Sequence, residues 1–280
     1  MYIIKSTGEK QEFDPEKIRR TCLRAKAPAE ITEKIVREIS KEIKEGTKTA
    51  DIYRRVMALL ERESPALAGR YDLRNAIIRL GPAGFEFEKY IAMVLAEYGF
   101  KTELPPILQG SCTTHEVDIS AEKDGRRAMM ECKLRVSQEI YISIKDTMST
   151  WARFLDLVEG AGLGLCPHFD EVWLVTNSRF SHDSIQYGHC KNMVMLSWDH
   201  PRERPLPAWI EQKGLYPITI LRSLQPEMLT KFSGGGIMLL RDIDALSIGE
   251  IINRTGISEE ILRKLIAEAK DILGASSRDA

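Results

Sequence analysis

The first eighty residues follow two hydrophobic patterns in succession. A short apolar stretch, YIIK, a turn and a second run ending near Phe13 predict a β-hairpin. Apolar residues then recur at helical spacing, and Asp14-Pro15 supplies an N-cap and a first-turn proline. Helices are expected from about positions 15, 32 and 49, and over 65–80. The pattern predicts a hairpin that caps four helices.

Helices and strands are predicted to alternate after GPAG (81–84). We expect a helix over 85–99, a hairpin centred on Asp124-Gly125 and a long helix over 140–158, whose apolar residues follow a 3.6-residue period. The later strands are VWLVTN (172–177) and MVML (193–196), separated by a helix. This order predicts an α/β domain with helices on both faces of its sheet.

The last eighty residues are predicted to contain a connector and a small all-α domain. Residues 199–235 are proline-rich, and three short helices are expected over 237–273. The predicted domains are 1–83, a hairpin-capped helical domain; 84–200, the α/β domain; 201–236, a connector packed on it; and 237–280, the all-α domain.

The turn at Asp124-Gly125 predicts the register of its hairpin. In a two-residue turn, residues whose numbers sum to 249 lie opposite one another, so Asp118 faces Glu131. Lys133 shares the face of Glu131, while Met130, Cys132 and Leu134 form the apolar face toward the core. Opposed carboxylates are destabilising unless a cation lies between them, and Mg²⁺ suits such a pair. The alternative is a solvated face of mixed charge on which Lys133 lies opposite Glu116.

Charge and cysteine content restrict the classes of function. The net charge of −1 gives no general sign of nucleic-acid binding. Residues 1–83 carry 18 Lys/Arg and 13 Asp/Glu, which suits an anionic ligand or simply a solvated helix surface. Five scattered cysteines without a CxxC pair argue against a disulfide framework or a zinc ribbon. With no signal peptide and no apolar run long enough to span a bilayer, we expect a cytoplasmic protein without membrane contact.

The predicted α/β domain resembles the Mrr-like restriction endonucleases over roughly 84–200. The likeness rests on FEKYIAMVLAEYGF (87–100), VD (117–118), ECK (131–133) and LVTNSRFSHDSIQYGHC (174–190). It implies a restriction-endonuclease-like mixed sheet flanked by helices, and hydrolysis of DNA with Mg²⁺ or Mn²⁺. His115-Glu116 replaces the glycine that usually precedes the valine-Asp step.

The resemblance also implies roles for individual residues. Asp118 and Glu131 would hold the metal, and the carbonyl of Cys132 would complete its shell. Lys133 would orient the attacking water and offset negative charge in the transition state. Glu88, on the first helix of the domain, would position the ion or its water.

The N-terminal segment resembles the ATP-cone, a regulatory nucleotide-binding module. The likeness rests on IIKSTG (3–8), FDPEKI (13–18), GTKTADI (46–52) and YDLRNAIIRLG (71–81). It implies ATP or dATP as a regulatory ligand, with Lys5 and Lys17 at the phosphates, Thr49 offering a hydroxyl and backbone N–H groups, and Ile3 against the base. Ser6 stands where the family often has arginine, which leaves open a module kept only for folding or oligomerisation. Because the chain has no GxxxxGK[ST] loop, nucleotide is expected to regulate the protein and not to fuel it.

The segment 239–273 is similar to a helix-hairpin-helix domain. Such domains present backbone amides of a glycine-containing turn to a DNA phosphate. The corresponding turn here, residues 244–247, reads DALS and lacks those glycines. DNA contact and a role in packing or protein interaction therefore both remain open.

Together these patterns predict a Mg²⁺-dependent DNA endonuclease regulated by ATP or dATP. Its partners would be DNA and nucleotide, and cleavage of both strands would favour a homodimer. The alternative is a catalytically inactive, nucleotide-sensing DNA-binding regulator.

Overall fold

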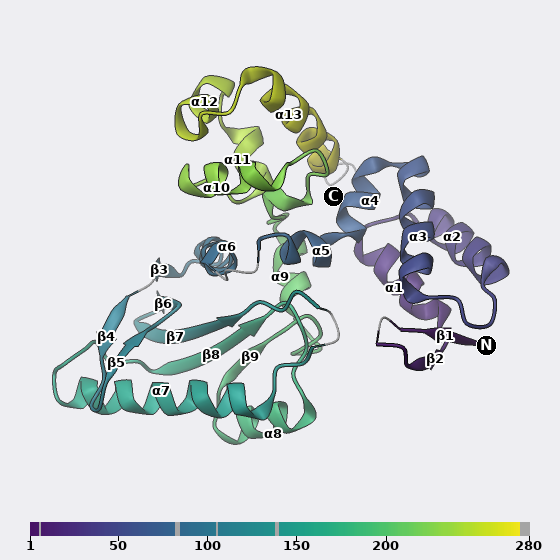
Figure 1. Cartoon of the computed structure of the whole chain (residues 1–280). Helices are drawn as coiled ribbons and strands as arrows, with labels where there is room; N and C mark the ends of the chain where they lie inside the picture. The colour runs from purple at the N-terminus through teal and green to yellow at the C-terminus, as the bar shows by residue number, and fades with distance from the viewer. Residues whose placement is uncertain (6, 82–84, 105, 138–139, 275–280) are drawn as a thin grey trace. The chain divides into compact units, whose positions relative to one another are not determined.

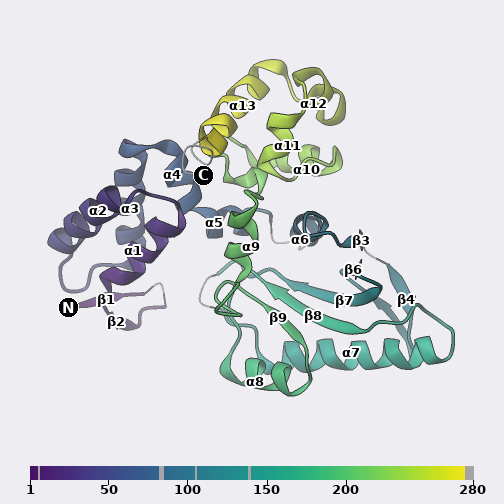
Figure 2. The ribbon, with the colours of Figure 1, turned by 180° about the vertical axis from the view of Figure 1, so that it is seen from behind.

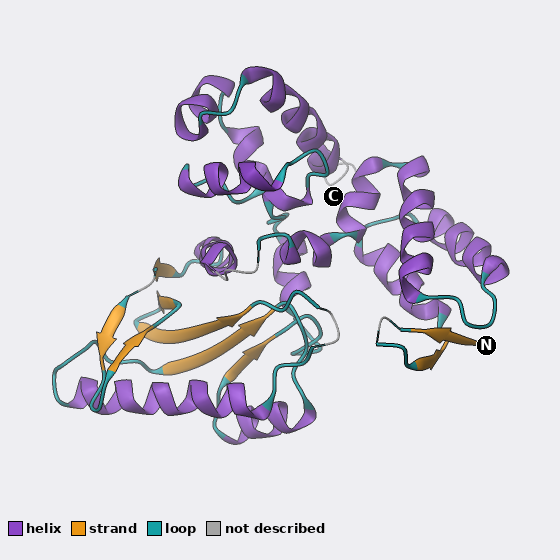
Figure 3. Cartoon of the chain, viewed as in Figure 1, coloured by secondary structure: helices purple, strands orange, loops and turns teal. Residues whose placement is uncertain are grey.

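A computed structural model describes residues 1–5, 7–81, 85–104, 106–137 and 140–274. The chain forms two compact units: unit 1 combines residues 1–76 with 218–280, and unit 2 comprises 77–217. Figure 1 traces both units, and Figure 3 shows the large sheet in the second and the N-terminal hairpin in the first. None of the helices in the described ranges is long and apolar enough to cross a membrane.

Unit 1 begins with the expected hairpin and helices. The antiparallel strands are β1 (Tyr2–Ile4) and β2 (Lys10–Glu12). The helices are α1 (Pro15–Arg24), α2 (Ala29–Glu42), α3 (Thr49–Glu63), α4 (Pro65–Tyr71) and α5 (Leu73–Ile78). The Asp14 side chain caps α1 by accepting a hydrogen bond from the N–H of Glu16 at 3.0 Å, as expected of an N-cap. The single helix predicted over 65–80 is wrong: it is divided at Asp72 into α4 and α5.

The C-terminal helices pack against the N-terminal ones within unit 1. They are α10 (Pro226–Gly234), α11 (Leu240–Ala245), α12 (Ile248–Thr255) and α13 (Glu259–Gly274), preceded by a 3₁₀ turn at Ile218–Ile220. Arg70 of α4, only 1% exposed, donates to the carbonyl of Ile272 in α13 at 2.6 Å. Arg222 pairs with Glu61 at the end of α3, so two distant parts of the chain share one body.

Unit 2 is a mixed sheet between helices, as the α/β prediction required. Its order is β3-β6-β7-β8-β9, with β6 and β7 antiparallel and β7, β8 and β9 parallel. Figures 1 and 2 show α7 and α8 on one face of the sheet and α6 on the other. The strands are β3 (Lys101–Glu103), β6 (Ile119–Lys123), β7 (Arg126–Lys133), β8 (Glu171–Thr176) and β9 (Val194–Leu196); the helices are α6 (Phe85–Ala96), α7 (Ile144–Gly162), α8 (His182–Cys190) and α9 (Leu206–Gln212).

A second, two-stranded sheet lies against α7. It consists of β4 (Ile107–Gln109) and β5 (Thr114–Glu116), and the carboxylate of Asp156 in α7 accepts from the N–H of Cys112 in the loop between them at 2.7 Å. Glu116 therefore pairs with Ile107 in this sheet, and the expected pairing with Lys133 is wrong. The predicted connector 201–236 is shared: its first part packs in unit 2, where Tyr98 donates to the carbonyl of Trp209, and its remainder belongs to unit 1.

The hairpin of β6 and β7 has the predicted register. Ile119 lies opposite Met130, and both turn residues have positive φ, 52° at Asp124 and 74° at Gly125, as a type I′ turn requires. The prediction that only one face of β7 is buried is wrong, because Met129 and Glu131 are 0% and 4% exposed. The parallel partner β8 makes β7 a central strand with helices on both faces, so the face of the hairpin is not solvated at Met129 and Glu131.

The positive φ of Gly125 makes this turn a test of the hairpin. We expect Gly125→Ala to lower the free energy of unfolding of unit 2 by about 1–2 kcal/mol, because a Cβ disfavours the left-handed conformation. All four tryptophans of the chain lie within unit 2, so tryptophan fluorescence during urea unfolding reports on this unit. Gly162→Ala, at the end of α7 with open space around it, is the control and should not destabilise. Equal losses in both variants would contradict the turn assignment.

Candidate active site and nucleotide site

Asp118 and Glu131 meet where the β6–β7 ladder ends. The last paired residues are Ile119 and Met130. At the next residue, the side chain of Asp118 takes the place of a backbone acceptor: its Oδ2 accepts a hydrogen bond from the N–H of Cys132 at 2.7 Å. The opposed carboxylates predicted from the turn are therefore neighbours in the fold, and Cys132 contributes its backbone N–H at this point.

Glu131 is a buried carboxylate held by two cations. Lys133, two residues along the same strand, pairs with Oε1, and Arg153 from α7 pairs with Oε2. Arg153 also donates to the carbonyl of Glu116. A carboxylate that is 4% exposed is costly unless both oxygens have partners. These two ion pairs therefore compensate the burial of Glu131 and attach α7 to the centre of the sheet.

Burial and mutual repulsion raise the pKa of two neighbouring carboxyls. Burial, and after it the charges of Asp118 and Glu131, raise the pKa of Glu88 on α6 to about 7. The pKa of Asp118 rises to about 6, chiefly through burial and then through Glu131, while the N–H of Cys132 opposes the rise. The structure thus brings together all four residues expected to be catalytic: Glu88, Asp118, Glu131 and Lys133.

The cluster is negatively charged, as a cation site would be, but the carboxylate of Glu131 is already paired with two side chains. Glu116 also raises the pKa of Glu88, so four carboxylates lie near two cationic side chains and the fully ionised cluster is negatively charged. In the described part of the chain, no group of three or more His, Cys, Asp or Glu side chains is arranged to hold a metal ion. A divalent ion would have to draw Glu131 away from at least one of its present partners. Coordination by the carbonyl of Cys132 stays a prediction.

Arg153 is the site residue that sequence reasoning missed. It lies three residues after Thr150 and four before Leu157, both buried on the sheet side of α7. A cation at an apolar-face position of an amphipathic helix was the available signal. The sequence could not show which buried acid it would meet, because that acid lies 22 residues away on another element.

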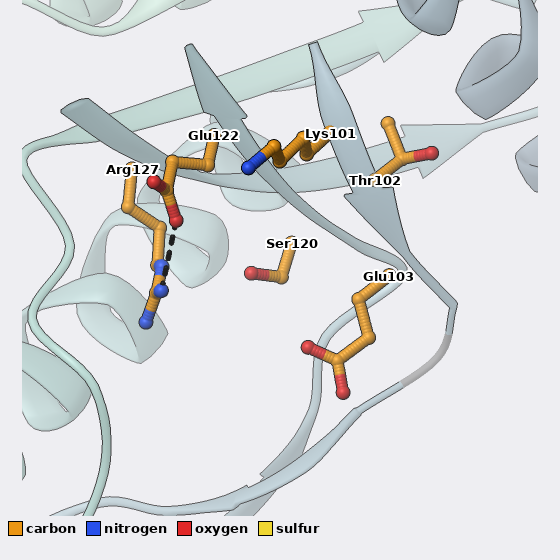
Figure 4. Close-up of a pocket in the computed structure, with 6 residues that line it drawn as sticks. All are labelled: Lys101, Thr102, Glu103, Ser120, Glu122 and Arg127. Carbon is orange, nitrogen blue, oxygen red and sulfur yellow. Dashed lines mark hydrogen bonds and ion pairs between the residues drawn. The ribbon is translucent and has the colours of Figure 1, made fainter. Parts of the chain in front are cut away.

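A polar hollow is lined by residues of β3, β6 and β7. Figure 4 shows its lining residues, which are Lys101, Thr102, Glu103, Ser120, Glu122 and Arg127. Ser120 is two residues from Asp118 and therefore on the same face of β6. Arg127 pairs with Glu122 at 3.0 Å, so this part of the face is polar but internally neutralised.

Strand β1, which carries Ile3 and leads to Lys5, lies beside the start of α3. The N–H of Ile4 donates to the carbonyl of Thr47 at 3.0 Å, which places β1 against the start of α3 at Thr49. Lys5 follows at the end of β1 and pairs with Glu9 at 2.9 Å. Lys17 is exposed on the first turn of α1. Ile3 is 6% exposed and belongs to the hydrophobic core, and Ser6 lies outside the described residues.

Comparisons with known proteins bear on both ends of the chain. The model of the ATP cone domain matches residues 1–76, and the model described as AF1548-like, C-terminal, matches residues 216–273. The N-terminal part is thus an ATP-cone domain, as predicted. The C-terminal part is a small helical domain as expected, and the model that matches it is the AF1548-like one; its likeness to helix-hairpin-helix domains stays a prediction.

Two relatives cover about two thirds of the chain. An uncharacterized protein from Archaeoglobus fulgidus is 38% identical over 185 residues, which are 66% of this chain and 100% of the relative. The crystal structure of AF1548, a protein of unknown function, is 34% identical and superposes with a TM-score of 0.61, covering 69% of this chain and all of that one. The solved relative shares the fold over the part of the chain that it covers, and neither description states an activity.

The raised pKa of Glu88 predicts a pH-dependent stability. Since its folded pKa of about 7 exceeds its ordinary value of 4.5, the stability that the protonated carboxyl contributes is complete below about pH 4.5 and is lost as the pH rises through 7. Glu88→Gln should therefore match the wild type near pH 4.5 and exceed its free energy of unfolding by about 1–2 kcal/mol at pH 8, a value reduced for partial exposure.

Urea unfolding followed by tryptophan fluorescence across this pH range measures the difference. Glu86→Gln, two residues earlier in the first turn of α6, is the control for loss of a carboxylate from the same helix. A stability difference between Glu88→Gln and wild type that does not change with pH would show that the pKa of Glu88 is not raised in the folded protein.

Proposed function

The chain belongs to the AF1548-like family, and we propose from the residues of its charged cluster that its α/β unit is a divalent-metal-dependent DNA endonuclease regulated by nucleotide. The observation that carries the proposal is the convergence of Glu88, Asp118 and Glu131 beside Lys133. The mixed sheet with helices on both faces agrees with a restriction-endonuclease-like fold. In that fold the three residues Asp118, Glu131 and Lys133 match the Asp…Glu-x-Lys signature.

The residues present fit Mg²⁺ or Mn²⁺. Mg²⁺ takes one or two carboxylates and completes its shell with water and phosphate oxygens, which Asp118 and Glu131 can satisfy together with the substrate. When bound, the ion would polarise the phosphodiester and lower the pKa of the attacking water. It would also offset the repulsion that now raises the pKa of both Glu88 and Asp118.

The protein's own side chains have definite roles in this hydrolysis. One water forms a new P–O bond, the bond to the leaving oxygen breaks, and the water's proton must be accepted. Glu88, whose pKa is raised chiefly by its burial, can accept that proton, and the leaving oxygen takes up a proton from water. Lys133 and Arg153, which pair with Glu131 before substrate arrives, can turn to the phosphate and stabilise its developing negative charge.

Regulation by nucleotide would begin at the ATP-cone and pass along α3. The helix starts at Thr49, beside β1, and near its other end Glu61 pairs with Arg222 of the AF1548-like C-terminal domain. Arg70, one helix further on, donates to α13 of the same domain. A ligand that shifts α3 would therefore act first on the C-terminal domain.

A second function is favoured by one observation. Both oxygens of Glu131 are paired with cations, which would also suit a site that no longer binds metal. The protein would then be a nucleotide-sensing DNA-binding regulator that does not cut. Glu88 and Asp118 would in that case have no cation to relieve their repulsion.

Plasmid cleavage distinguishes these two functions. We expect the wild type to nick or linearise supercoiled DNA with Mg²⁺ or Mn²⁺ and not with EDTA, and Asp118→Asn to lower the rate at least about a hundredfold. Glu122→Gln, which removes a carboxylate from the same strand four residues away, should retain activity. A wild type that binds but does not cleave DNA with either metal, with or without ATP or dATP, would support the regulator and refute the nuclease.

Nucleotide binding is tested separately by calorimetry. We expect ATP or dATP to bind the full chain, and Lys17→Ala to weaken binding roughly tenfold because a charged phosphate contact is lost. Lys41→Ala, an exposed lysine near the end of α2, is the matched control and should bind as the wild type does. No measurable heat with either nucleotide would remove the regulatory proposal while leaving the nuclease proposal intact.

A further inference from the structure

The outward side of α7 carries an apolar stripe that its own unit leaves uncovered. Met148 and Leu155 are 48% and 42% exposed although both are large and apolar. Ala152, between them on the same side, is exposed as well. Figures 1 and 2 show the sheet along one side of α7 and no described element of unit 2 along the middle of the opposite side.

Opposite charges lie at equal distances from the centre of this stripe. Lys145 is seven residues before Ala152 and Glu159 seven residues after it, so each lies about two helical turns away on the same side of α7. Both are exposed, and within the described residues neither forms an ion pair. The stripe is therefore apolar at its middle, positive at one end and negative at the other.

We infer that this stripe is a dimer interface, in which α7 of one chain packs antiparallel against α7 of a second copy. A two-fold axis at Ala152 places Lys145 of one copy beside Glu159 of the other, twice. The small side chain of Ala152 allows the helices to approach closely, and Met148 and Leu155 of one helix then cover those of its partner. Any other apolar partner would need its own charges in this mirrored order, whereas a second copy supplies them by symmetry.

The interface is small, and it places two sites close to its axis. A single helix pair buries less than the roughly 1,600 Å² of a standard interface, so the dimer dissociates on dilution. Arg153, the partner of Glu131, follows Ala152 in the chain, so the two-fold axis at Ala152 lies on one side of α7 and the charged cluster on the other. The dimer does not depend on the nuclease proposal and is measured without reference to activity.

Charge reversal with the full-length protein tests the pairing. Sedimentation or light scattering from about 1 to 100 μM should show a monomer–dimer equilibrium. Lys145→Glu and Glu159→Lys should each weaken the dimer about tenfold, because each places like charges together twice. The double variant Lys145→Glu/Glu159→Lys restores opposite charges and should restore the wild-type dissociation constant.

The outcomes that overturn the inference are equally definite. Lys41→Glu, the same charge change on α2, should leave the dimer unchanged, and tryptophan fluorescence verifies that every variant is folded. A wild type that is monomeric at all concentrations would overturn the inference. So would a dimer that the single reversals do not weaken, or a double variant weaker than either single one.

Discussion

A buried carboxylate in the central strand determines how unit 2 is assembled. Glu131 lies on β7 with helices over both faces of the sheet, where an unpaired charge would be strongly destabilising. Lys133 reaches it from the same strand, and Arg153 must reach it from α7. The ion pair of Arg153 with Glu131 thereby fixes the position of α7 on the sheet. It also holds the charged cluster at the end of β6 in place.

The same pairing explains why the cluster can be both stable and reactive. Two cations compensate Glu131, but they leave Asp118 and Glu88 to repel each other and to remain partly protonated near neutral pH. In the proposed nuclease, a cation between Asp118 and Glu131 would gain these interactions and would free Lys133 and Arg153 for an anionic substrate. The ion pairs that stabilise the site without metal would therefore lower its affinity for an ion, because they must break before the ion binds.

The sequence predicted contacts between neighbouring elements better than contacts between elements far apart in the chain. The Asp-Gly turn was sufficient to predict the register that places Asp118 next to Glu131, because turn geometry sets strand pairing. The burial of Glu131 was not predictable from the hairpin alone, since it depends on β8, which joins β7 from about forty residues away. Arg153 was missed for the same reason. The break at Asp72 was missed because helical periodicity continues through it.

Locating a divalent ion in crystals of the full chain grown with Mn²⁺ tests the proposed metal site most directly. Anomalous diffraction should place the ion between the carboxylates of Asp118 and Glu131, with Arg153 withdrawn from Glu131. Crystals soaked in Mn²⁺ that show no ion at this position, and in which Arg153 still pairs with Glu131, would contradict it.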